Sequence, residues 1–109
     1  TSKAITEKGY FTVTSSAMTA FTAVAGDQLL VDTTQTTVTI TLPAAPAVGD
    51  EVVFIDARGT FASNALTIER NGKPINSGTN NLALGTNGQA ITLVFIDSTR
   101  GWAYKTNTA

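Results

Sequence analysis

Two aspartates at the ends of similar segments are the side chains best suited to chemistry. VFIDARG (Val53–Gly59) and VFIDSTRG (Val94–Gly101) each place an acidic residue after an apolar run, with Arg and Gly shortly behind it. A carboxylate pair, here Asp56 and Asp97, serves a glycosidase when the two groups lie roughly 5–9.5 Å apart around a sugar-sized cleft. An Asp at a strand end also accepts backbone N–H bonds in a turn, and a following Gly permits a positive φ. We favour the turn, because the sequence contains no insertion large enough to form a cleft.

The residue types that are missing exclude several other kinds of site. The chain contains no His and no Cys, which removes the commonest general base, any Ser–His or Cys–His pair, thiolate metal sites and disulfides. Phosphate-binding glycine loops, calcium-loop patterns and N-glycosylation sequons are also absent from it. We therefore expect a protein that is not an enzyme and that holds no cofactor and no metal.

Charge and hydropathy limit the partners. The net charge is -1, and the seven Lys and Arg form no basic stripe, so we expect no nucleic-acid binding, which depends on clustered cations. No apolar run approaches the roughly 20 residues of a membrane-spanning helix, so we expect no membrane partner. The opening TSKAITEKGY, where a small Thr favours removal of an initiator Met, suggests a free-standing protein of about this length.

Alternating apolar and polar residues predict β-strands throughout the chain. In Thr36–Leu42, Val38, Ile40 and Leu42 share one face and threonines fill the other. Asn71–Gly72 suits a two-residue type I′ turn. The pattern favours an all-β fold, a compact antiparallel β-sandwich or jelly-roll-like domain with an extended N-terminal arm. The other expected strands are Tyr10–Thr14, Phe21–Ala25, Gln28–Asp32, Glu51–Asp56, Ala65–Arg70, Lys73–Ile75, Asn81–Leu84, Ala90–Asp97 and Gly101–Thr106.

The first twenty residues differ from the rest, because they are polar and weakly periodic. We expect residues 1–20 to form the arm and residues 21–109 to form the β-sandwich domain. Within the arm, Ile5, Tyr10 and Phe11 are the candidate apolar anchors for a partner, since aromatic residues dominate interface energetics. The alternative is that Tyr10 and Phe11 begin the first strand and pack in the core.

The two VFID strands are apolar on both faces. Period-2 geometry places Val53 and Ile55 on the face opposite Phe54, and Val94 and Ile96 likewise share one face. An antiparallel sheet usually keeps one face polar, so these strands need a cover on their second face. We identify Val53, Ile55, Val94 and Ile96 as candidate residues of an interface between copies of the chain. Cover by the chain's own loops is the alternative.

The segment Trp102–Tyr104 is the one aromatic motif with a binding chemistry of its own. Alternation places Trp102 and Tyr104 on the same strand face, where they would form a platform for stacking against a sugar ring. Burial in the core or in an interface is the commoner fate of such side chains, because each buries roughly 150–250 Å².

The stretch from Gly26 to Thr106 resembles a small β-domain that recurs in virion proteins of bacteriophages, both in tail fibres and on head surfaces. The resemblance rests on VDT followed by TVTITLP, the P-x-x-GD crossing, the VFID strand, the LTI-x-RNG hairpin and the closing RGW, in this order and spacing. Members of this family are structural, usually trimeric and not catalytic. The resemblance therefore supplies no catalytic residue.

The resemblance implies a virion domain but not its position on the particle. The expected free-standing length of the chain favours a capsid decoration (cement) protein that binds the major capsid protein on the outer surface of the mature head, as a homotrimer, and stabilises the shell. Its expected location is the virion, after synthesis in the host cytoplasm. The opening TSK also resembles the start of head decoration proteins of lambda-like phages. The alternative is a tail-fibre or head-fibre receptor-binding module, in which Trp102, Tyr104 and the loops near Asn71 and Asn80 contact the receptor. A cell-wall-degrading enzyme is the weakest interpretation.

Overall fold

The computed structural model describes residues 9–16 and 18–108 of the chain. These residues contain nine strands and no helix, which confirms the prediction of an all-β protein. The strands are β1 (Tyr10–Thr14), β2 (Ala20–Thr22), β3 (Gln28–Asp32), β4 (Val38–Thr41), β5 (Glu51–Asp56), β6 (Leu66–Glu69), β7 (Leu82–Leu84), β8 (Ala90–Asp97) and β9 (Gly101–Thr108).

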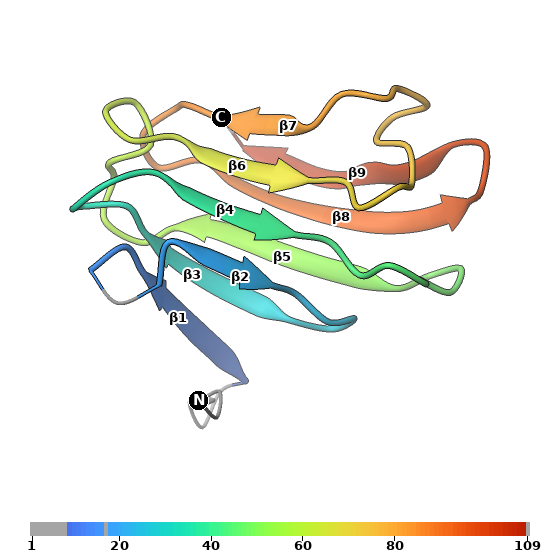
Figure 1. The fold of residues 1–109 in the computed structure, drawn as a ribbon, viewed down its shortest axis with the longest axis horizontal. Helices are drawn as coiled ribbons and strands as arrows, with labels where there is room; N and C mark the ends of the chain where they lie inside the picture. Colours follow the sequence, from blue (N-terminus) through green and yellow to red (C-terminus); the bar gives the residue numbers. More distant parts are fainter. Residues whose placement is uncertain (1–8, 17, 109) are drawn as a thin grey trace.

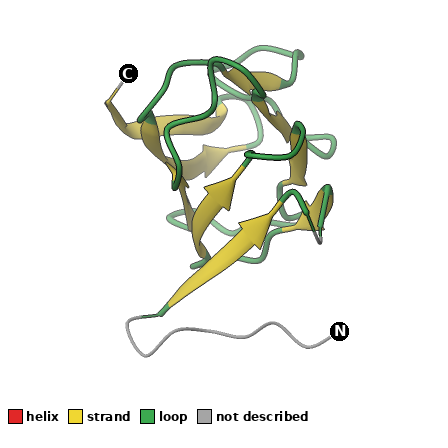
Figure 2. Ribbon diagram, turned by 90° about the vertical axis from the view of Figure 1, so that its left-hand side faces the viewer, coloured by secondary structure: helices red, strands yellow, loops and turns green. Residues whose placement is uncertain are grey.

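The strands form two sheets, which lie as two layers (Figures 1 and 2). The first sheet, sheet A, has the order β1-β3-β5-β8-β9, and the second, sheet B, has the order β2-β4-β6-β7. The chain crosses from one sheet to the other after each of its first five strands. The chain therefore winds as a flattened coil. Each strand that returns to a sheet runs parallel to the previous strand of that sheet. After β6 the winding ends, and the remaining pairs are antiparallel.

The predicted antiparallel pairing is wrong for the first two-thirds of the chain. Four of the seven strand pairs among the described residues are parallel, so the order also differs from that of a jelly roll, which is antiparallel. The physical reason is that period-2 alternation reports which face of a strand is buried and carries no information on the direction of its neighbour. Most of the short connections cross between the layers.

One apolar core fills the space between the layers. Buried positions alternate with partly exposed ones along nearly every strand, and β4 shows the predicted pattern, with Val38 and Ile40 buried and threonines on the outer face. The largest fully buried side chains come from both sheets and from the β4–β5 and β5–β6 connections: Trp102, Phe54, Phe61, Leu29, Ile40, Leu42, Leu66 and Ile68.

Strand β1 belongs to this body. It pairs with β3 along its whole length, and Phe11 and Val13 lie in the core. The ring of Phe11 stacks on that of Phe21 at 5.1 Å between centroids, which joins the first strands of the two sheets. The predicted division between arm and domain at residue 20 therefore falls inside the compact body. The alternative, that Tyr10 and Phe11 begin the first strand, describes the structure.

The predicted strand Lys73–Ile75 is replaced by a loop that crosses to the other sheet. The Asn71–Gly72 turn is present, with positive φ at both residues and a bond from the Lys73 N–H to the Arg70 carbonyl. Beyond it the chain does not return along β6. It runs to the start of β9, where the Trp102 N–H donates to the Pro74 carbonyl at 2.8 Å.

Gly101 permits this contact between the loop and β9. Its φ is +72°, and a Cβ placed on it would lie 1.9 Å from the carbonyl oxygen of Pro74. The corresponding glycine of the first segment, Gly59, has φ +68° but no neighbouring atom within 4 Å of such a Cβ. The two glycines thus share a backbone conformation and differ in the space around them.

This difference predicts unequal effects of the same substitution. Gly59→Ala is expected to lower the free energy of unfolding by about 1–2 kcal/mol, the cost of a left-handed residue with a Cβ. Gly101→Ala is expected to lower it by about 2–5 kcal/mol, because displacement of the Pro74 backbone adds an overpacking cost. Chemical denaturation of both variants measures the difference. Equal losses would show that the close approach of Pro74 is not maintained in solution.

Candidate functional site

The carboxylate of Asp56 is held by backbone donors from two loops. Its Oδ1 accepts N–H bonds from Gly59 at 2.9 Å and from Thr60 at 3.1 Å, with a longer one from Arg58 at 3.3 Å. Its Oδ2 accepts from Phe61 at 3.2 Å and from Gly88 at 2.9 Å. The residue is 7% exposed. Asp56 therefore closes the β5–β6 connection and ties it to the turn before β8.

The ionisation of Asp56 fits this structural role. Burial acts to raise the pKa of the carboxyl group, but the backbone donors, with Gly88 and Phe61 foremost, outweigh it and lower the pKa below the ordinary value. A general acid of a glycosidase needs the opposite, a raised pKa that keeps the proton on near neutral pH. The charged form is the stable form of Asp56 in the fold.

Asp97, its counterpart in the second segment, lies in a different setting and far away. It is exposed, and its Oδ1 accepts N–H bonds from Thr99 and Arg100 at 2.9 and 2.6 Å. The Asp56 N–H donates to the Gln89 carbonyl, so Asp56 lies beside the start of β8. Asp97 is eight residues further along that strand (97 − 89), which corresponds to about 26 Å at ~3.3 Å per residue. The two carboxylates cannot form a glycosidase pair, and each serves a turn, as predicted.

Arg58, the arginine of the Val53–Gly59 segment, forms an ion pair with a residue outside that segment. Arg58 Nε lies 3.5 Å from Asp32 Oδ2, at the end of the neighbouring strand β3. The hydroxyl and the backbone N–H of Thr34 contribute most to lowering the pKa of Asp32, and Arg58 adds to them. The Arg58 side chain is 67% exposed, so this ion pair contributes little to stability.

The aromatic platform predicted from Trp102 and Tyr104 is not available to a ligand. Trp102 is fully buried and meets Phe95 edge to face, with 5.5 Å between ring centroids. The 74–78 loop crosses the start of β9, which the sequence pattern of the strand alone does not reveal. Of the two predicted receptor contacts, only Tyr104 is exposed, at 39%.

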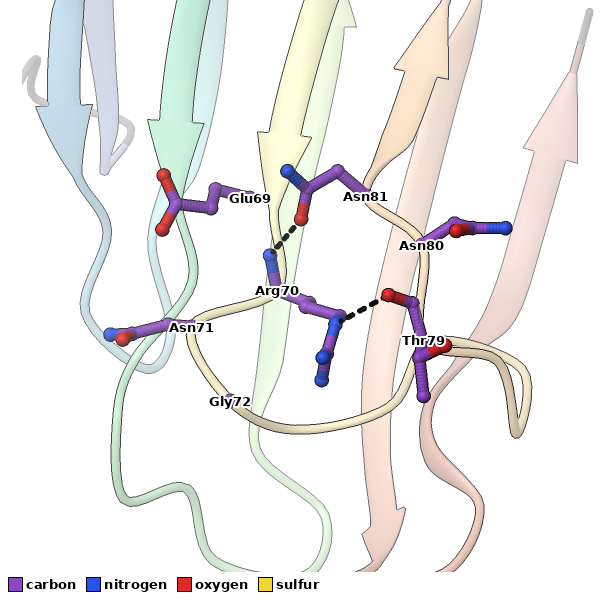
Figure 3. Close-up of a pocket in the computed structure, with 7 residues that line it drawn as sticks. All are labelled: Glu69, Arg70, Asn71, Gly72, Thr79, Asn80 and Asn81. Atoms are coloured by element: carbon purple, nitrogen blue, oxygen red, sulfur yellow. Dashed lines mark hydrogen bonds between the residues drawn. The ribbon is translucent and has the colours of Figure 1, made fainter.

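The asparagine-rich loops predicted for a receptor site do lie together. The connection between β6 and β7 borders an open polar pocket of about 440 Å³, and Figure 3 shows its side chains. Arg70 is fixed there by the carbonyls of Thr79 and Lys73, at 2.9 and 3.2 Å, while the Asn81 side chain accepts the Arg70 N–H. The lining residues are Glu69, Arg70, Asn71, Gly72, Thr79, Asn80 and Asn81.

The predicted interface residues lie on the outer face of sheet A. Val53, Ile55 and Val94 are half-buried and point away from the core, since their strand neighbours fill it. Ile96 lies at the end of β8, at an irregularity of the β8–β9 pairing, and is 41% exposed.

The three predicted capsid contacts do not share one described surface. Ile5 lies outside the described residues. Tyr10 is half-buried on β1, and Phe11 belongs to the core and presents no exposed ring.

A second repeat, which the sequence interpretation missed, shapes the loops at one end. VAGD (Val24–Asp27) and AVGD (Ala47–Asp50) precede β3 and β5 and have the same structure. In each, the carboxylate of the Asp accepts the N–H of the residue three positions earlier, at 2.9 and 2.8 Å, and the Gly has a positive φ. A Gly–Asp pair directly before an apolar strand, occurring twice, is the signal in the sequence.

Comparison with known proteins adds no family to these observations. No protein-family model matches the chain, and no curated protein matches it. Within residues 9–16 and 18–108 there is no group of three acidic residues close enough to hold a metal ion. The same residues include no helix long and apolar enough to cross a membrane.

The hydrogen bonds of Asp56 predict that replacing one of its carboxylate oxygens by an amide nitrogen lowers stability markedly. Asp56→Asn is expected to lower the free energy of unfolding by about 3 kcal/mol, because bonds to a charged acceptor are lost and buried N–H groups remain. The matched control, Asp97→Asn, is expected to cost less than about 1 kcal/mol at an exposed turn. Denaturant titration at pH 7 measures both.

The same comparison at low pH tests the charge itself. Because the pKa of Asp56 is lowered in the fold, its contribution is complete above the ordinary value of 3.8 and is lost as the pH falls through the folded value. The stability difference between the wild type and Asp56→Asn should therefore shrink below about pH 4. A difference that stays constant down to pH 2 would contradict the role of the charged form.

Proposed function

We propose that this chain is a structural protein of a bacteriophage virion that binds the outer surface of the mature head as an oligomer and stabilises the shell. The sequence resemblance to virion β-domains supports this function. The structural observation that carries it is the contrast between the outer faces of the two sheets, because one of them has the composition of a contact surface.

The outer face of sheet B is polar. Thr39 and Thr67 are half-buried neighbours in the middle of that face. On sheet A three neighbouring positions of the outer face are apolar: Leu30 lies beside Ile55, and Val53 follows on the same face of β5, with Thr92 of β8 opposite Val53. A solvent-facing sheet normally alternates to polar residues on its wet side, so the apolar face requires a partner.

The margins of the apolar face are polar. Lys105 Nζ bonds Glu51 Oε2 at 3.0 Å across β8, and the exposed Thr12 lies beside Leu30 on the edge strand. An apolar centre inside a polar rim is the usual anatomy of a protein interface. We assign this face to contacts between copies of the chain, in the trimer that the resemblance implies.

The stabilising action is mechanical. The coil of parallel strands provides a rigid body, and each copy would hold neighbouring subunits of the major capsid protein together. The N-terminal arm of the proposal is confined to residues 1–8, because β1 lies within sheet A. Its apolar residue Ile5 is the proposed anchor on the capsid surface.

A second candidate function is a receptor-binding module of a fibre, and the polar pocket of the β6–β7 connection favours it. Amide groups, one carboxylate and one guanidinium line the pocket (Figure 3). Opposite charges of Glu69 and Arg70 leave it near neutrality, which suits hydroxyl-rich ligands such as glycans. Its residues come from one connection, and the pocket lacks an aromatic ring for stacking.

The number of copies in the virion distinguishes the two functions. We expect quantitative mass spectrometry of purified particles to give a ratio to the major capsid protein close to that of a shell-wide component. A ratio of only a few copies per particle would place the chain on the tail or a fibre and favour the receptor-binding module. Absence from the particle would overturn both.

The outer face of sheet A predicts the effect of a single charge. Ile55→Lys is expected to convert the oligomer to a monomer, because an ammonium group would be buried in an apolar interface. Thr67→Lys places the same side chain at the middle of the outer face of sheet B and should leave the oligomer intact. Sedimentation velocity of both variants measures the mass. Dissociation by Thr67→Lys alone would assign the interface to the wrong sheet.

A further inference from the structure

We propose that one end of the two-layer body, formed by the tips of three connections, is the surface that lies against the capsid protein of the shell. This surface, called the loop end below, consists of Val24 with its β2–β3 turn, Val48 with its β4–β5 turn, and Ile96 at the end of β8. The inference rests on the proposed decoration function and adds the part of the body that contacts the shell.

The most exposed apolar side chains gather at the loop end. Among the described residues, four large apolar side chains are classed as exposed, and three of them are Val24 at 56%, Val48 at 76% and Ile96 at 41%. The strand ends that carry them lie on the right-hand side of Figure 1. Loop tips are ordinarily polar, so three exposed apolar residues on neighbouring tips indicate a contact surface.

Backbone hydrogen bonds hold the three tips next to one another. The Gly26 N–H of the first turn donates to the Glu51 carbonyl, at the start of β5, at 2.7 Å. The Gly49 N–H of the second turn donates to the Phe95 carbonyl, directly before Ile96, at 2.8 Å. The three connections that carry the apolar residues therefore lie side by side at this end of the body.

The acidic groups of the loop end are engaged in its own turns. The carboxylate of Asp27 accepts the Val24 N–H at 2.9 Å, and that of Asp50 accepts the Ala47 N–H at 2.8 Å. Asp97 likewise accepts two N–H bonds within its turn. These carboxylates stiffen the turns, so binding has little loop ordering to oppose it. The partner that fits is a folded protein whose surface offers apolar contacts to the three tips.

The position of Gly9, the first described residue, supports the shell as that partner, given the capsid anchor of the proposed function. The Gln28 side chain donates to the carbonyl of Gly9 at 3.4 Å, and Gln28 directly follows the β2–β3 turn. Gly9 therefore lies beside the β2–β3 turn of the loop end, and an anchor segment of eight residues before it would reach at most about 26–29 Å. The anchor and the loop end can contact the same shell surface.

Contacts between copies are assigned to the outer face of sheet A around Leu30, Val53 and Ile55. Of the predicted interface residues, Ile96 at the end of β8 is assigned to the loop end instead. In a ring of copies whose strands run along the symmetry axis, the loop ends of all copies point to the same side. They would then form one apolar base. This arrangement leaves the loop end free for the shell.

The test combines the purified full-length protein with heads of the phage that encodes it. The heads are prepared so that they lack this protein. The variant Val24→Ser/Val48→Ser is expected to bind these heads roughly a hundredfold more weakly than the wild type, about tenfold for each valine. Tyr104→Ser, which removes an exposed apolar side chain from β9, is the matched control and should bind normally. Bound protein per head is measured by gel densitometry after sedimentation.

Each outcome separates the inference from the function on which it rests. Wild-type protein that does not bind the heads would refute the decoration function. Wild-type protein that binds, with a double variant of equal affinity, would overturn the loop-end assignment alone. A double variant that sediments as a smaller species would assign the loop end to contacts between copies. If the double variant proves unstable, Val48→Lys, at the most exposed position, carries the same expectation with an added charge.

Discussion

The buried carboxylate of Asp56 is the constraint on which the rest of the fold depends. It lies where the parallel winding gives way to antiparallel strands, and it holds both sides of that junction. The β5–β6 connection reaches it through donors that include Phe61, whose ring is fully buried, and the turn before β8 reaches it through Gly88. One ionised side chain therefore sets how the last winding of the coil meets the C-terminal hairpin, and it does so through Gly88, which lies 32 residues away from it in the sequence.

Aspartates act in the same way at several strand ends, and this use of charge has a consequence for the surface. Asp27 and Asp50 close the turns before β3 and β5, and Asp32 and Asp97 cap the turns after β3 and β8. In a chain in which 14% of residues are charged, several carboxylates thus accept hydrogen bonds from the chain's own backbone. The outer faces then differ in composition: threonines lie at the middle of the outer face of sheet B, and half-buried Leu30, Val53 and Ile55 lie on that of sheet A.

Period-2 alternation predicted the elements well and their arrangement poorly. The bounds of β1, β3, β5 and β8 coincide with those expected from the sequence, because a half-buried strand needs alternation over its full length. The parallel pairing was not predicted, since strand direction is set by the crossings between sheets. The repeated Gly–Asp turns were the available signal of a winding chain. The burial of Trp102 depends on a loop about 27 residues earlier, which no pattern within β9 reports.

The two VFID segments show how little a shared motif says about a shared role. Asp56 is buried beneath five N–H donors, whereas Asp97 is exposed and accepts two. Gly59 has free space around it, and Gly101 lies against the Pro74 backbone. What the segments have in common is the need to stop an apolar strand and turn the chain, for which Asp and Gly are the suitable residues. The motif that most resembles catalytic machinery is therefore structural. The surfaces that we assign to assembly carry no motif, because an interface needs apolar area in the right place and not a fixed order of residues.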